Sequence, residues 1–169
     1  MKVVGLAGWS GAGKTTLLIR LIPLLAGRGI AVSTLKHAHH AFDVDTPGKD
    51  SHAHRVAGAR QVLVASANRW ALMTELRGAP EPPLAELLGR LSPVDLVVVE
   101  GFKREPLHPK VEVHRAANGK PWLHPGDPSI RAVASDAPLP GGAVLPRADL
   151  DSLDAVADLV LGVAAPWPN

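Results

Sequence analysis

The sequence predicts an α/β protein in which a mostly parallel central sheet is flanked by helices. Two apolar, strand-like runs lead to this prediction, because each is followed by residues that suit the ligand-binding edge of such a sheet. The first run precedes the glycine-rich segment 8–16, and the second, residues 96–99, ends at Glu100. Two further strand-like runs, 61–65 and 70–75, predict an antiparallel hairpin that extends the sheet.

Composition limits the kind of protein. The 169 residues suit one domain over residues 1–169, and 46% hydrophobic residues suffice for its core. The sequence has no cysteine, which excludes disulfides and thiolate zinc sites and fits a reducing cytoplasm. The formal net charge of +2 gives no reason to expect nucleic acid as a partner. Neither a signal-peptide pattern nor an apolar run of membrane-spanning length is seen, so we expect no membrane association.

Residues 8–16 read Gly-Trp-Ser-Gly-Ala-Gly-Lys-Thr-Thr and match the phosphate-binding P-loop pattern G-x-x-x-x-G-K-[ST]. Glycines let backbone N–H groups turn toward an anion, and the following helix adds the positive end of its dipole there. Lys14 is expected to bridge the β- and γ-phosphates of a nucleoside triphosphate, and the Thr15 hydroxyl to ligate Mg²⁺. The alternative is a glycine-rich turn with an incidental lysine. The complete pattern, lying between a strand and a helix, favours the P-loop NTPase fold. We therefore expect the chain to form a single P-loop nucleotide-binding domain.

Two acidic residues follow strand-like runs. Glu100 is expected at the carboxyl end of its strand near the P-loop, where it can hold the hydration shell of Mg²⁺ or orient a water. Asp136 follows the run 130–134, and a carboxylate there suits guanine N1 and its exocyclic amine. The sequence contains no Asn-Lys-x-Asp motif to support that guanine contact.

The rest of the chain alternates helix-like and strand-like segments. Pro23 should kink or restart the first helix, which is expected over 15–25. The tail 164–169 is expected to be loose, and Trp70 and Met73 to lie in the core. The other expected elements are strands at 30–36 and 110–114 and helices at 50–58, 82–91 and 149–163.

Residues 37–60 hold five of the eight histidines. Three interpretations stay open: a transition-metal site, a polar loop without a role, and a switch-like loop beside the P-loop. In the third, which we favour, carboxylates reach Mg²⁺ through water while Lys49 and Arg55 meet phosphate or another anion.

The sequences of these motifs, and their order along the chain, resemble those of the MobB family, which takes part in molybdopterin-guanine dinucleotide biosynthesis. The resemblance covers most of the chain, and the segment after Pro121 matches least clearly. Its most specific parts are the runs Lys-His-Ala-His-His and Asp-Val-Asp-Thr-Pro-Gly-Lys-Asp-Ser. The sequence segments that carry the resemblance are 8–16, 36–40, 42–51, 55–59, 69–75 and 99–103.

The resemblance implies a GTP-binding homodimer with at most slow GTPase activity, which works as an adapter beside the molybdopterin guanylyltransferase. Further partners that it implies are molybdopterin and molybdoenzymes. It assigns catalytic roles to Lys14 and Glu100 and Mg²⁺ to Thr15 and Glu100. The phosphate-binding residues that it implies are Gly11, Ala12, Gly13, Lys14, Thr15 and Thr16.

Two other functions fit the same P-loop. A small-molecule kinase would need an acceptor pocket and an arginine-bearing lid, for which residues 104–115 are a poor candidate. A metal-delivery GTPase would use the histidine-rich segment as its store, with His37, His39, His40, His52 and His54 as ligands.

Overall fold

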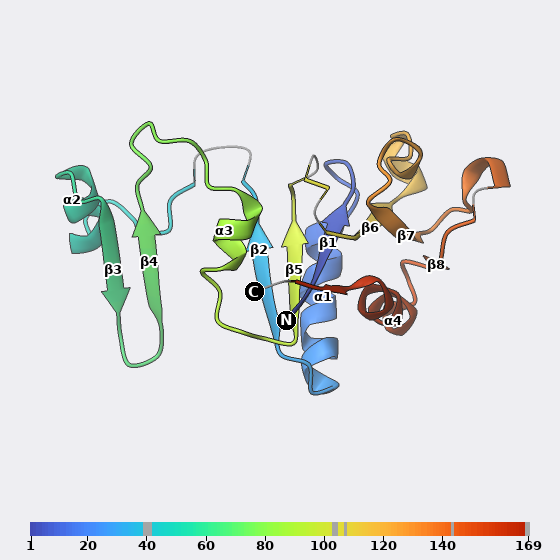
Figure 1. Ribbon diagram of the computed structural model, residues 1–169, viewed down its shortest axis with the longest axis horizontal. Coiled ribbons are helices and arrows are strands. Elements are labelled where there is room, and N and C mark those ends of the chain that lie inside the picture. Colours follow the sequence, from blue (N-terminus) through green and yellow to red (C-terminus); the bar gives the residue numbers. More distant parts are fainter. Residues whose placement is uncertain (39–41, 103–104, 107, 143, 168–169) are drawn as a thin grey trace. The chain divides into compact units, whose positions relative to one another are not determined.

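The computed structural model describes residues 1–38, 42–102, 105–106, 108–142 and 144–167. The chain divides into two compact units, whose elements are shown in Figure 1. One unit comprises Met1–His37 and Leu84–Asn169, and the other comprises Ala38–Pro83. The expectation of one nucleotide-binding domain over the whole chain stays a prediction.

The larger unit is built around a mostly parallel sheet with the order β2–β5–β1–β6–β7–β8, in which β9 adds an antiparallel pairing to β1. Strand β1 lies between β5 and β6, to which it is parallel (Figure 1). This confirms the predicted fold class. The strands are β1 (Lys2–Ala7), β2 (Val32–Lys36), β5 (Leu96–Glu100), β6 (Lys110–His114), β7 (Ile130–Ser135), β8 (Arg147–Ala148) and β9 (Ala165–Pro166).

Helices cover both faces of this sheet. The long helices α1 (Lys14–Gly27) and α4 (Leu153–Val163) share one hydrophobic cluster with Val4 and Leu6 of β1. The short helix α3 (Leu84–Leu88) packs with Val3 and with β5 in a second cluster. Successive β1 side chains therefore alternate between the two layers, as a strand buried on both faces requires. Short 3₁₀ turns occur at Ala116–Asn118, His124–Gly126 and Pro140–Gly142.

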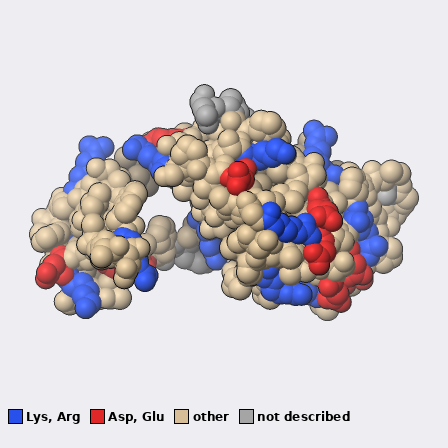
Figure 2. All heavy atoms as spheres, turned by 90° about the horizontal axis from the view of Figure 1, so that it is seen from below, with Lys and Arg blue, Asp and Glu red and all other residues tan. Residues whose placement is uncertain are grey.

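Charged side chains of both signs share the surface. Arg28, just after α1, forms ion pairs of 2.6 Å with Asp154 and Asp158 of α4. On the face shown in Figure 2, acidic and basic side chains are intermixed over the larger unit. None of the helices in the described part of the chain is long and apolar enough to cross a bilayer.

Several expectations about element ends were wrong. Helix α1 is continuous through Pro23 to Gly27, so the restart was wrong and the kink stays a prediction. Burial of Leu21 and Leu25 on either side offsets the lost backbone hydrogen bond. The tail is ordered up to Trp167, contrary to expectation. Strand β9 pairs with β1, and the Trp167 side chain packs against the hydrophobic cluster that contains α3. Helices α3 and α4 are shorter than predicted.

The smaller unit consists of helix α2 (Asp50–Val56) and the two-stranded antiparallel sheet of β3 (Gln61–Ala65) and β4 (Trp70–Thr74). The hairpin is therefore confirmed as antiparallel, although it forms its own sheet. The expectation that Trp70 lies in the core was wrong, since this side chain is 66% exposed. Strand alternation puts Trp70 on the same face as Leu63 and Leu72, while α2 packs near β3.

The α3 side of the larger unit contains a polar layer along β6. Glu112 accepts hydrogen bonds from the backbone N–H groups of Leu123 and His124, and Lys110 Nζ lies 3.1 Å from Asp127 Oδ2. The ring of His108 is buried against Gly5, where a Cβ would lie 2.6 Å from Nε2. Neither ring nitrogen of His108 has a hydrogen-bond partner within the described residues. Burial, reinforced by the Lys110 charge and opposed by Asp127, lowers the pKa of His108 to about 4.

His108 should therefore make the fold sensitive to mild acid. In the folded protein the His108 ring stays neutral down to about pH 4, whereas in the unfolded chain the ring binds a proton below its ordinary pKa of 6.5. The free energy of unfolding is therefore highest above pH 6.5 and falls as the pH is lowered toward 4. We expect the free energy of unfolding to drop by about 3 kcal/mol over this range through His108. Denaturant unfolding at pH 7, 5.5 and 4.5 measures it. The His108→Phe variant should lose this part of the pH dependence, and an identical dependence in both proteins would contradict the assignment.

Candidate functional site

The carboxyl ends of four parallel strands meet at one edge of the central sheet. The P-loop follows β1, Glu100 ends β5, Arg115 follows β6 and Asp136 follows β7. The topology thus brings residues from four separate parts of the sequence to the start of α1. This is where α/β sheets of this kind bind ligands.

The P-loop backbone has the conformation that its glycines predict. Gly8, Gly11 and Gly13 have φ angles of 148°, 82° and 89°, which L side chains rarely adopt. At Gly8 there is also no room for a side chain, since a Cβ would lie 2.5 Å from the Val113 carbonyl oxygen. Gly13 is the N-cap of α1, and its carbonyl accepts the N–H of Leu17. The loop therefore directs backbone donors and the positive end of the α1 dipole to one point.

Lys14, the first residue of α1, reaches back across this loop. Its Nζ donates to the carbonyl oxygens of Gly8 and Trp9 at 2.9 and 3.0 Å. The ammonium group is thus held over the loop and away from the hydrophobic core. An anion seated in the loop would meet this charge without a change in the backbone.

Thr15 and Glu100 are brought together as predicted, although they are 85 positions apart. The Thr15 hydroxyl donates to Glu100 Oε1 at 2.7 Å, and Glu100 is 8% exposed. Gly101 and Phe102 follow with left-handed φ angles of 100° and 47°, which turn the chain away directly after the carboxylate. A hydroxyl and a carboxylate are oxygen ligands of the kind that Mg²⁺ prefers, so the pair fits this ion.

The loop after β6 docks on the P-loop, a contact that was not expected from the sequence. Asn118 Nδ2 donates to the Ser10 carbonyl at 3.1 Å, and Trp9 Nε1 donates to the Pro121 carbonyl at 2.7 Å. Arg115 lies beside Gly13, where a Cβ would be 3.3 Å from its Nε. None of these residues forms a recognisable motif, because only the parallel pairing of β1 with β6 brings them to the P-loop.

Asp136 lies at the same edge and has protein partners there. Its Oδ1 accepts the backbone N–H of Ala116 at 2.9 Å, and its Oδ2 is 3.7 Å from Arg115 Nη1. A carboxylate has further acceptor sites, so these partners leave capacity for a base. The guanine contact of Asp136 stays a prediction.

Arg55 of the smaller unit is paired with acidic side chains of the same unit. Arg55 forms two hydrogen bonds with Asp45, an ion pair of 3.0 Å with Asp43 and a longer one of 3.8 Å with Glu75. These partners, first among them Asp45, raise the pKa of Arg55 above its ordinary value. Arg55 therefore has acidic partners within its own unit, and its contact with phosphate or another anion stays a prediction.

The histidine-rich segment shows no metal centre in the part of the chain that can be described. No group of three or more metal-binding side chains occurs among residues 1–38, 42–102, 105–106, 108–142 and 144–167. His39 and His40 lie outside the described residues, so the predicted store is not tested as a whole. His37 packs on the Phe102 ring with 4.6 Å between ring centroids.

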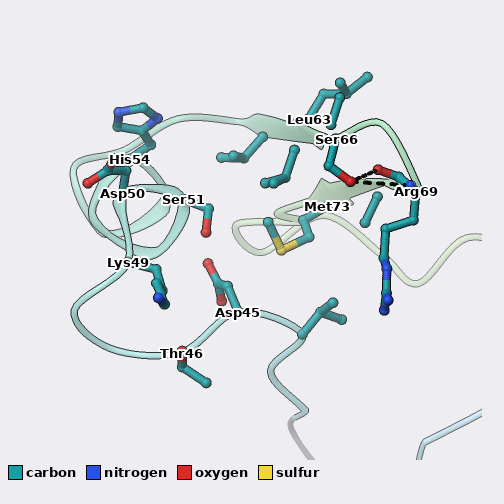
Figure 3. Close-up of a pocket in the computed structure, with 15 residues that line it drawn as sticks. Asp45, Thr46, Lys49, Asp50, Ser51, His54, Leu63, Ser66, Arg69 and Met73 are labelled. Carbon is teal, nitrogen blue, oxygen red and sulfur yellow. Dashed lines mark hydrogen bonds between the residues drawn. The ribbon is translucent and has the colours of Figure 1, made fainter.

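A cavity of about 710 Å³ lies within the smaller unit (Figure 3). Its apolar wall comes from both strands of the hairpin, Val62 and Met73 among them, and its polar wall from α2 and the preceding loop. Lys49 and Arg69 lie at opposite sides in this view, and Asp45 lies between them. The cavity is distinct in composition from the P-loop site and was not expected from the sequence.

Comparison with known proteins agrees with this geometry. The profile of the family "Molybdopterin guanine dinucleotide synthesis protein B" (MobB) matches residues 3–136. The molybdopterin-guanine dinucleotide biosynthesis adapter protein of Escherichia coli K12 is 45% identical over 161 residues, covering 94% of this chain and 91% of the relative. The corresponding protein of Haemophilus influenzae is 43% identical, covering 94% and 86%.

Solved structures show the same fold. A MobB homologue from Bacillus stearothermophilus has a TM-score of 0.70 at 27% identity and covers 95% of each chain. Bacillus subtilis MobB has a TM-score of 0.75 at 24% identity, covering 99% of this chain and all of the other.

The central sheet, the glycine conformations and the Thr15–Glu100 contact define an α/β protein of the P-loop class. Within that class, the match over residues 3–136 and the 45% identity show that the chain belongs to the MobB family.

Proposed function

We propose that this protein is a GTP-binding accessory protein of molybdenum cofactor biosynthesis that supports the conversion of molybdopterin to molybdopterin guanine dinucleotide. It acts as an adapter beside the molybdopterin guanylyltransferase, which performs the transfer. The observation that carries the proposal is the complete phosphate cradle, with Lys14 over it and Thr15 bound to Glu100, in a chain of the MobB family. The named relatives, called adapter proteins, support the pathway assignment.

The described side chains supply distinct parts of nucleotide binding. Backbone N–H groups of residues 11–16, with the α1 dipole, hold the phosphates, and Lys14 adds a positive charge to them. The Thr15 hydroxyl and Glu100 hold Mg²⁺ and its water, and Asp136 accepts from guanine. Turnover is slow because these contacts, apart from the water that Glu100 orients, stabilise substrate and transition state alike. The protein is at most a slow GTPase.

Competition for a fluorescent GTP analogue tests the proposal. Unlabelled GTP should displace the analogue in the presence of Mg²⁺ at concentrations at least about tenfold lower than ATP, which is the discrimination expected from hydrogen bonds to a base. Equal competition by ATP and GTP would contradict guanine recognition. Formation of a phosphorylated pterin or nucleoside product would instead favour the kinase alternative.

We further propose that the protein is a homodimer joined through its hairpin. The hairpin has α2 near one face and exposes apolar side chains on the other, and exposed apolar patches mark protein–protein interfaces. Leu63, Trp70 and Leu72 on that face are 61%, 66% and 44% exposed. Sedimentation equilibrium should give twice the 17.7 kDa chain mass, and a monomer at all protein concentrations would contradict the dimer.

The finer assignments of partner and place rest on the resemblance. Direct binding to the guanylyltransferase, and contacts with molybdopterin and molybdoenzymes, are proposed on that ground. We propose a cytoplasmic location because a chain without cysteine suits a reducing compartment. Co-purification of the guanylyltransferase with the tagged protein tests the first of these, and failure to detect a complex at micromolar concentrations would contradict it.

A further inference from the structure

The P-loop motif accounts for one cationic side chain at the phosphate site, Lys14, but the fold places a second beside it. Arg115 follows β6 directly, and its Nε lies 3.3 Å from the position that a Cβ on Gly13 would take. Gly13 is the residue whose left-handed backbone leads from the cradle into α1. The guanidinium is therefore next to the amides that would grip an anion.

The segment that follows Arg115 is held by hydrogen bonds to Asp136 and to the P-loop. The N–H of Ala116 is held by Asp136 Oδ1 at 2.9 Å, and Asn118 Nδ2 is hydrogen-bonded to the Ser10 carbonyl of the P-loop at 3.1 Å. The Asn118 N–H also closes the turn on the Arg115 carbonyl. The backbone of Arg115 is thus anchored to the P-loop itself, which limits the entropy lost when its side chain binds a ligand.

The side chain of Arg115 is held less firmly than its backbone. Its Nη1 is 3.7 Å from Asp136 Oδ2, which is longer than a hydrogen bond, and the two side chains are 40% and 29% exposed. An ion pair with this geometry contributes little to stability, so structure alone gives a weak reason for an arginine here. Guanidinium groups bind phosphate through paired, charge-assisted hydrogen bonds.

We propose that Arg115 binds the phosphate chain of the nucleotide, exchanging its long contact with Asp136 for hydrogen bonds to phosphate oxygens. The inference rests on the proposed nucleotide function and adds a phosphate ligand that lies outside the P-loop motif. Because the contact is made to phosphate and not to the base, it serves GTP and ATP equally. It stabilises bound substrate, so it affects affinity more than turnover at saturation.

Affinities for two ligands, each measured with Mg²⁺, distinguish a phosphate contact from a base contact. The ligands are GTP and inorganic tripolyphosphate, which has no base. The Arg115→Gln variant should bind each of them about ten- to a hundredfold more weakly, the loss expected when hydrogen bonds to a charged group are removed. Arg115→Lys should recover part of the affinity. Arg131→Gln, which removes an exposed arginine on β7 away from the P-loop, is the matched control for the lost charge and should bind as the parent does. Thermal unfolding checks that each variant is folded.

Unchanged tripolyphosphate affinity in Arg115→Gln would overturn the inference, whether or not GTP binding weakens, because a loss limited to GTP indicates a base or ribose contact. An equal loss in Arg131→Gln would also overturn it, since general charge would then explain the effect. If the parent protein binds neither ligand, the proposed nucleotide function fails first. That outcome is distinguishable, because it appears before any variant is compared.

Discussion

The Lys14→Ala variant is expected to lose GTP affinity by about a hundredfold or more while remaining folded. The ammonium group lies over the P-loop, bonded to the Gly8 and Trp9 carbonyl oxygens, so its loss removes a charge from the phosphate site and leaves the core intact. Charge-assisted hydrogen bonds to phosphate are worth about 1.5–3 kcal/mol each, and two of them give this loss. The two hydrogen bonds of the ammonium to Gly8 and Trp9 are lost as well, so the unfolding free energy should fall by about 1–3 kcal/mol, which leaves the protein folded.

Titration of the variant with a fluorescent GTP analogue measures this loss. Lys2→Ala provides the control, because Lys2 is an exposed lysine at the start of β1, the end opposite the P-loop. The control should bind as the parent does. GTP affinity unchanged in Lys14→Ala would show that the role given to Lys14 is wrong.

The Glu100→Gln variant is expected to reduce GTP turnover by about tenfold or more and to change GTP affinity by about threefold or less. The amide oxygen of glutamine can still accept the Thr15 hydroxyl at 2.7 Å, so the site keeps its shape. The negative charge that holds Mg²⁺ and its water is lost, and positioned carboxylates contribute at least this much to the reacting step. The effect therefore falls on hydrolysis more than on binding.

Single-turnover phosphate release from pre-bound GTP separates the two effects. Glu86→Gln is the control, because Glu86 is a half-exposed residue of α3 paired with Arg90 and lies outside the site. Equal hydrolysis by Glu100→Gln and the parent would remove Glu100 from the mechanism.

Local pattern accounts for much of the fold. The strands β1 and β5 are buried on both faces over most of their length, and their sequences are recognisable because nearly all of their buried positions are apolar. The hairpin was readable from its two strand-like runs, and Thr15 and Glu100 from their motif positions. Each of these features was recognised from its own short segment of the sequence.

The features that sequence reasoning missed depend on contacts between distant segments. The tail was expected to be loose because Ala-Ala-Pro-Trp-Pro-Asn has no periodic pattern, yet β9 finds its partner in β1, more than 160 positions away. Trp70 was expected in the core because large aromatics usually pack inside, but the two-stranded sheet leaves that face uncovered within its unit. Arg115 was passed over because only the pairing of β6 with β1 brings it to Gly13.

A crystal structure with a non-hydrolysable GTP analogue and Mg²⁺ would show whether the P-loop binds the nucleotide and where the metal lies. We expect the phosphates to lie on the backbone amides of residues 11–16, with the metal beside Thr15 and Glu100. A nucleotide bound elsewhere, or a P-loop that stays empty at saturating analogue, would contradict it.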